Sequence, residues 1–276
     1  MITAVADAIA EGVLPGRLWL YSNYHCNLAC TYCLTDSAPG VPKRALTAAA
    51  MVRAVEQAAA LGFTEVGVTG GEPFLAPGIV DTLARMAPIL PTLVLTNGTL
   101  FGPAQLGRLG SLPSQRVSFQ LSLDSPDPDV NDAARGPDNF AKVIDAVPRL
   151  VEQGFRVRIA STATVMEPDD LARLCELHRN LGIPDEDHVV RPIARRGRGV
   201  DIDEAVPVEQ TDLPPELTVT ADGTFWSPFG PTVRDGRVDT DLLLTRTTDP
   251  LSVPAEALAR ALAGRPHGAD TTFTFR

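Results

Sequence analysis

Three of the four cysteines lie close together, in the segment His25-Cys26-Asn27-Leu28-Ala29-Cys30-Thr31-Tyr32-Cys33. A loop with this Cys-x3-Cys-x2-Cys spacing can place three thiolates on one face of an iron–sulfur cubane and leave one iron without a protein ligand. An open iron can bind a further molecule, as an open zinc position does in zinc enzymes. The spacing therefore predicts a catalytic [4Fe-4S] cluster on Cys26, Cys30 and Cys33.

Structural zinc is the main alternative for these thiolates. A tetrahedral zinc site requires a fourth ligand, and His25 is adjacent in sequence to Cys26, which is poor geometry for binding one ion together. Three crowded cysteines favour a metal site over disulfides in a reducing compartment. The residues therefore favour a cluster over zinc.

The fourth cysteine, Cys175, lies apart from the motif. It shares one face of a predicted helix with Leu171, Leu174 and His178. This spacing favours a small core residue over a hydrogen-atom donor for Cys175.

The elements that must position the cysteine loop alternate along the chain. Strands are expected at residues 18–21, 65–68, 93–96, 117–123, 155–160 and 188–191, and helices at 47–62, 79–90, 139–153 and 169–181. Strands alternating with helices predict parallel βα units in an α/β fold. Six such units fit a partial (β/α)6 TIM-like barrel better than a closed eight-stranded barrel. The loops after the strands line the site in such folds, and the cysteine motif directly follows the first strand.

The chain is expected to divide into three parts: residues 1–16 as a lead-in, 17–200 as the barrel and 201–276 as a small extension rich in β-hairpins. Asp222-Gly223 and Asp235-Gly236 lie between β-prone residues, which is a strong hairpin signal. A last helix is expected at residues 254–262. We expect the extension to cap the mouth of the barrel.

A glycine motif follows the second predicted strand, in Thr69-Gly70-Gly71-Glu72-Pro73. A Gly-Gly pair alone is ordinary at a turn. With Tyr32 just before the last cysteine, however, the cysteine motif resembles the signature of the radical S-adenosylmethionine (SAM) superfamily, and residues 70–73 resemble its Gly-Gly-Glu-Pro motif. The resemblance implies a cluster whose open iron binds SAM and whose electron cleaves SAM to a 5′-deoxyadenosyl radical. It also implies that this motif, with Glu72, binds the methionine ammonium group.

Further polar residues follow the third, fourth and fifth predicted strands. Ser122-Leu123-Asp124-Ser125, with Arg135-Gly136 downstream, resembles the branch that contains sulfatase-maturing and peptide-modifying enzymes. That resemblance implies that Ser122 binds SAM and that Arg135 pairs with its carboxylate, as a guanidinium can with two parallel bonds. A surface arginine and a loop cap remain the alternatives for Arg135 and Asp124. The expected cofactor-binding residues are Tyr32, Gly70, Gly71, Glu72, Pro73, Asn97, Ser122, Asp124, Arg135 and Thr164, and no catalytic residue is assigned.

The extension departs from the pattern of that branch. Residues 217–229 resemble a hairpin that in many relatives carries cysteines for auxiliary clusters. Here Ser227 and Pro228 stand where a cysteine is expected, and no cysteine occurs after Cys175. We therefore expect one cluster.

Composition excludes some classes of partner. The net charge of −10 and the pI near 4.9 argue against nucleic acid or an anionic membrane as the main partner. The N-terminus has no basic segment followed by an apolar core, and no stretch is apolar enough for a membrane helix. We expect a cytoplasmic enzyme served by an external electron donor such as flavodoxin or ferredoxin.

The substrate is open at this point. The short stretch before Arg17 leaves no room for a leader-peptide-binding domain, which favours a small metabolite or natural-product precursor over a peptide substrate. An iron–sulfur electron-transfer or sensor protein is the alternative of another class. The motif at residues 70–73 and Arg135 argue against it, because an electron carrier has no use for a pocket that binds an aminocarboxylate.

Overall fold

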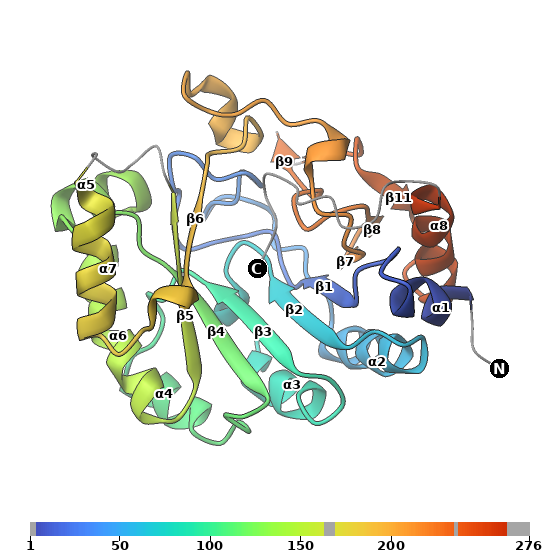
Figure 1. The fold of residues 1–276 in the computed structure, drawn as a ribbon, viewed down its shortest axis with the longest axis horizontal. Helices are drawn as coiled ribbons and strands as arrows, with labels where there is room; N and C mark the ends of the chain where they lie inside the picture. Colours follow the sequence, from blue (N-terminus) through green and yellow to red (C-terminus); the bar gives the residue numbers. More distant parts are fainter. Residues whose placement is uncertain (1–3, 163–168, 235–236, 264–276) are drawn as a thin grey trace.

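The computed structural model describes residues 4–162, 169–234 and 237–263. Its centre is a nine-stranded sheet in the order β11-β8-β7-β1-β2-β3-β4-β5-β6, in which β1 to β6 are parallel neighbours in chain order. Helices α2, α3, α4, α6 and α7 lie along the outer face of the curved sheet (Figure 1). The six strands are β1 (Arg17–Tyr21), β2 (Glu65–Thr69), β3 (Thr92–Thr96), β4 (Val117–Ser122), β5 (Arg156–Thr162) and β6 (His188–Arg191). The predicted partial (β/α)6 barrel is confirmed.

The helices pack apolar faces against this sheet. Thr47 caps α2, since its side chain accepts a hydrogen bond of 3.1 Å from the Ala50 amide. The same helix buries Met51, Val55 and Ala58. The helices are α1 (Ala4–Ala10), α2 (Ala48–Ala60), α3 (Ile79–Met86), α4 (Pro103–Leu109), α5 (Pro128–Arg135), α6 (Asn139–Glu152), α7 (Asp170–Asn180) and α8 (Ser252–Leu262). The predicted helices correspond to α2, α3, α6, α7 and α8, whereas α1, α4 and α5 were not predicted. No described helix is long and apolar enough to cross a membrane.

The extension lengthens the barrel sheet. Strand β7 (Thr218–Thr220) pairs in parallel with β1, and β8 (Gly223–Phe225) pairs antiparallel with β7. A strand that the sequence did not reveal, β11 (Leu243–Thr245), pairs with β8. The short strands β9 (Val233–Arg234) and β10 (Arg237–Val238) form the second hairpin, whose turn lies outside the described residues. Both predicted strand pairs are confirmed.

Side chains fill the end of the barrel opposite the cysteines. Trp19 points inward from β1 and covers Gly67 on β2, where an added Cβ would lie 2.3 Å from the indole ring. The Trp19 indole N–H donates to the Glu216 carboxylate over 2.5 Å, and Arg17 lies 3.4 Å from the same carboxylate. Glu216 directly precedes the segment that enters β7, so the extension takes part in closing this end.

Candidate active site

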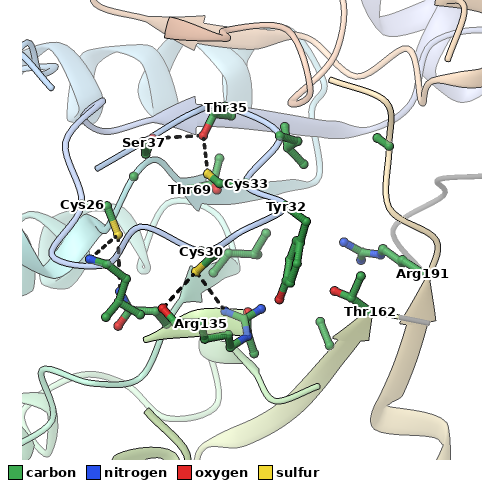
Figure 2. A pocket seen from close by; sticks show the side chains of 18 of the residues that line it. Cys26, Cys30, Tyr32, Cys33, Thr35, Ser37, Thr69, Arg135, Thr162 and Arg191 are labelled. Carbon is green, nitrogen blue, oxygen red and sulfur yellow. Dashed lines mark hydrogen bonds between the residues drawn. The ribbon is translucent and has the colours of Figure 1, made fainter. Parts of the chain in front are cut away.

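A cavity of about 250 Å³ lies at the carboxyl ends of the parallel strands, and Cys26, Cys30 and Cys33 line it. Figure 2 shows the cysteine loop on one side of this cavity and Arg191, from the end of β6, on the other. The predicted site residues that also line it are Tyr32, Gly70, Gly71, Asn97, Ser122 and Arg135. The fold therefore brings predicted site residues from five segments of the chain to one cavity, together with Arg191 from a sixth segment.

The three cysteine thiols line one cavity, which is the arrangement that a cluster with three thiolate ligands requires. Among the described residues, no three His, Cys, Asp or Glu side chains converge closely enough to hold one metal ion. A cubane is larger than an ion and takes its thiolate ligands at separate corners, so cysteines arranged around a cavity match its donor set. Burial raises the pKa of the Cys26 thiol to about 12 and also raises that of Cys30. Binding of a cluster must therefore drive the release of these protons.

Gly70 and Gly71 pack directly against the residues that lead into the cysteine motif. The Gly71 amide donates to the Asn23 carbonyl over 2.7 Å, and the Glu72 amide donates to the His25 carbonyl over 3.1 Å. A Cβ on Gly71 would lie 2.1 Å from the His25 carbonyl oxygen, and Gly70 has a φ of +154°. Only glycine allows this approach. The motif therefore positions the backbone just before Cys26 in addition to lining the cavity.

Glu72 does not line the cavity. Its carboxylate is fully buried and accepts hydrogen bonds from the Asn97 amide (2.8 Å), the Thr96 hydroxyl (2.9 Å) and the Phe74 amide (3.0 Å). Pro73, which begins the 3-10 turn Pro73–Leu75, is also buried and does not line the cavity. In the structure Glu72 thus joins the glycine motif to the end of β3.

Burial of this carboxyl group has a consequence for pH dependence. Burial raises the pKa of Glu72 from its ordinary value of 4.5 to about 7, although its three hydrogen bonds act in the opposite direction. The folded protein therefore keeps a proton that the unfolded chain has released. The contribution of Glu72 to the free energy of unfolding is therefore largest below about pH 4.5. It falls by about 3 kcal/mol as the pH rises through 7.

We expect Glu72→Gln to remove this pH dependence. Between about pH 5 and pH 7, the free energy of unfolding of the parent should fall relative to that of the variant by up to about 1.4 kcal/mol per pH unit. Urea denaturation at several pH values measures this difference. Glu56→Gln, on an exposed position of α2, is the control and should follow the parent. A difference between parent and Glu72→Gln that does not change with pH would contradict the assignment.

Asp124 and Arg135 form a buried ion pair beside the cavity. Asp124 is fully buried, and its Oδ2 accepts a hydrogen bond from Arg135 Nε over 2.7 Å and another from the Tyr32 hydroxyl. Its Oδ1 accepts from the Thr162 amide over 2.9 Å. Arg135 lines the cavity, with Nη1 4.0 Å from the Cys30 sulfur. The pair fixes the guanidinium, and Asp124 itself does not line the cavity.

Asn97 adds a contact between the end of β3 and the cysteine loop. Its side-chain amide lies 3.6 Å from the Cys26 sulfur and donates to the Asn27 side chain over 2.9 Å. Its oxygen accepts from the Thr99 amide and hydroxyl. Asn97 is thus positioned to donate toward the Cys26 sulfur.

Comparison with known proteins gives the family. Residues 20–181 match the family model described as the radical SAM superfamily. The chain belongs to this superfamily. Its members are enzymes that use a [4Fe-4S] cluster and SAM.

Several curated proteins have related sequences. The chain is 28% identical over 187 residues to an AdoMet-dependent heme synthase of Methanosarcina barkeri, covering 67% of this chain and 52% of that protein. It is 32% identical over 161 residues to a PqqA peptide cyclase of Ruegeria pomeroyi (58% and 42%), and 37% identical over 136 residues to a GTP 3′,8-cyclase of Geobacter sulfurreducens (47% and 40%). The chain thus spans about half the length of these curated relatives or less.

Two solved structures with bound S-adenosylmethionine share the fold. Streptococcus suis SuiB bound to S-adenosylmethionine superposes with a TM-score of 0.59 at 20% identity, over 75% of this chain and 47% of that one. Native anSMEcpe with bound AdoMet superposes with a TM-score of 0.60 at 13% identity, over 87% and 79%. At these identities the likeness shows the fold.

Two further predictions concern Thr164 and the helix face that carries Cys175. Thr164 lies outside the described residues. Cys175 is half-buried on α7, with its sulfur 3.8 Å from His188 Nδ1. Leu171, expected on the same buried face, is 45% exposed, because the buried side of α7 runs through Leu174 and His178.

Sequence reasoning missed several cavity residues. Tyr21, Gln120, Pro228 and Phe229 line the cavity, and the buried Gln120 side-chain oxygen has no hydrogen-bond partner in the described part of the protein. Tyr21 and Gln120 occupy inward positions on β1 and β4, so strand alternation carried a signal for both. Arg191, at the end of β6, also lines the cavity, and burial lowers its pKa to about 9.

Proposed function

We propose that this chain holds one [4Fe-4S] cluster on Cys26, Cys30 and Cys33 and binds SAM beside it. The observation that carries the proposal is the convergence of the three thiols with Gly70, Gly71 and the other lining residues on one cavity. When bound, the cluster supplies the electron that cleaves SAM to methionine and a 5′-deoxyadenosyl radical, which takes a hydrogen atom from the substrate.

The residues around the cavity would bind and orient these groups. Gly70 and Gly71 expose backbone atoms to the ligand without a side chain, and Arg135 presents its guanidinium beside Cys30. Ser122 contributes a hydroxyl group, which can donate or accept a hydrogen bond. Because Asp124 fixes Arg135 through Nε, the guanidinium keeps further N–H groups for the SAM carboxylate.

The substrate, whose C–H bond gives up the hydrogen atom, would occupy the part of the cavity away from the cysteines. Gln120 and Arg191 provide polar groups there, and Pro228 and Phe229 from the extension provide apolar surface. This mixture of polar and apolar groups favours a small metabolite or natural-product precursor, and we expect the extension to cover the cavity.

A peptide is the second candidate substrate. It is favoured by the similarity to PqqA peptide cyclase and by the shared fold of SuiB, which has been solved bound to the precursor peptide SuiA. The heme synthase and GTP cyclase relatives favour the small-molecule class instead. We further propose a cytoplasmic location and an electron donor such as flavodoxin or ferredoxin.

Anaerobic turnover tests the proposed function. The cluster-loaded protein is reduced with dithionite, supplied with SAM, and analysed for 5′-deoxyadenosine and methionine. We expect both products, and we expect addition of the true substrate to raise their yield. An electron carrier or sensor would keep its cluster without forming 5′-deoxyadenosine, and that result would overturn the proposal.

A further inference from the structure

Two segments that are distant in sequence contact the backbone that follows Cys30. Neither segment belongs to a strand of the barrel. One is the turn after β6, at Gly197 and Arg198, and the other lies in the extension at Thr232 and Val233. We propose that these segments form a brace that holds the cysteine loop in its cluster-binding shape, with Arg198 as its central positioning residue. This inference rests on the proposed function, since the brace acts on the cluster ligands.

Arg198 joins both ends of the loop segment 30–37. Its Nε donates to the Cys30 carbonyl over 2.7 Å, and its Nη2 donates to the Ser37 carbonyl over 2.8 Å. Its Nη1 lies 2.5 Å from the Asp36 carboxylate. One guanidinium thus spans the turn that carries Cys33, a geometry that a planar fork of donors allows and an ammonium group does not.

The backbone of the same turn fits closely against Cys33. The Arg198 amide donates to the Cys33 carbonyl over 3.0 Å. Gly197 has a φ of +54°, and a Cβ there would lie 2.3 Å from that carbonyl oxygen. Asp36, a non-glycine residue, is held at a φ of 56° beside Arg198. A non-glycine residue in this region is strained and persists because its surroundings hold it.

The extension completes the brace on the other side of Cys33. The Thr232 hydroxyl donates to the Leu34 carbonyl over 3.1 Å, and the Val233 amide donates to the Thr35 carbonyl over 3.0 Å. These contacts hold Thr35, whose hydroxyl lies 3.5 Å from the Cys33 sulfur (Figure 2). Partners that orient ligands typically change metal affinity by about 10–100-fold when removed. The extension, which has no cysteine of its own, would therefore act on the cluster in the barrel.

The test compares Arg198→Ala and Arg198→Lys with Arg195→Ala as the matched control. Arg195 lies on the same segment, and its side chain contacts the Asp203 carbonyl instead of the cysteine loop. Each protein is loaded anaerobically with its cluster and challenged with a chelator, and loss of iron absorbance is followed with time. We expect Arg198→Ala to lose iron roughly tenfold faster or more, Arg198→Lys to be intermediate, and Arg195→Ala to match the parent.

A second variant and a second measurement test the brace independently of Arg198→Ala. Thr232→Val removes one hydrogen bond with little change of shape and should also speed iron loss, by a smaller factor, even if Arg198→Ala does not fold. Hydrogen exchange on the full chain without its cluster should show faster exchange across residues 30–37 in Arg198→Lys and unchanged exchange in β3 and β4. If Arg198→Lys and Thr232→Val both retain iron and exchange like the parent, the brace is wrong. If the parent itself takes up no iron, the proposed function fails instead.

Discussion

Replacement of Cys26, Cys30 and Cys33 together by alanine is expected to abolish iron binding while the fold persists. The parent should bind about four irons and four sulfides per chain after anaerobic reconstitution, since the described residues offer these three thiols at one cavity. The cysteines lie in a loop, and the barrel core is built by other residues. Iron and sulfide analysis measures the loss, and circular dichroism checks the fold.

Cys175→Ala is the matched control for this experiment. Cys175 lies on α7, beside His188 and away from the cavity lining, so its replacement should leave the iron content unchanged. Full iron content in the triple variant would show that the cluster assignment is wrong. Eight irons per parent chain would show that the prediction of a single cluster is wrong.

Arg135→Ala is expected to lower both stability and SAM affinity. Removal of Arg135 leaves the fully buried Asp124 carboxylate without its cationic partner, which costs about 3–5 kcal/mol of unfolding free energy. If the guanidinium also binds the SAM carboxylate, SAM affinity should fall by about 1.5–3 kcal/mol, which is roughly ten- to over a hundredfold. Chemical denaturation and anaerobic SAM titration measure the two effects.

A second substitution separates these effects. Asp124→Asn in the Arg135→Ala background removes the unpaired charge and keeps an acceptor for the Thr162 amide, so it should restore stability without restoring SAM affinity. Arg149→Ala breaks an exposed pair with Asp145 on α6 and should change stability by less than about 1 kcal/mol. If Arg135→Ala binds SAM like the parent, Arg135 has no role in SAM binding.

The barrel could be predicted from the sequence because the patterns that indicate its strands and helices lie within short segments. Apolar runs and amphipathic spacing identified β1 to β6 and four of their helices, and Asp-Gly pairs identified both hairpins of the extension. The cysteine and glycine motifs were found for the same reason, since their spacing lies within short segments. Pairing of β7 with β1 depends on contacts between residues about 200 positions apart, such as Trp19 with Glu216, and no local pattern carries that information.

The site was predicted less completely, because a residue's type does not determine its partners. Arg135 and Asp124 were each identified from a motif, yet their mutual ion pair required the structure. Glu72 was expected at the ligand and is instead buried against the end of β3. Arg198 stood among four arginines of one segment, and its selection from them depends on contacts with residues 30–37.

The parallel pairing of β7 with β1 bears on the order in which this protein is completed during synthesis. β1 is the first strand of the sheet to be made, and it receives β2 after about forty further residues. Its other edge receives β7 only when residues 218–220 have left the ribosome. Until then β1 is an exposed edge strand with unpaired backbone groups, which can pair with other chains. A nascent chain stalled before β7 would therefore expose an unpaired, aggregation-prone strand edge beside the cysteine loop.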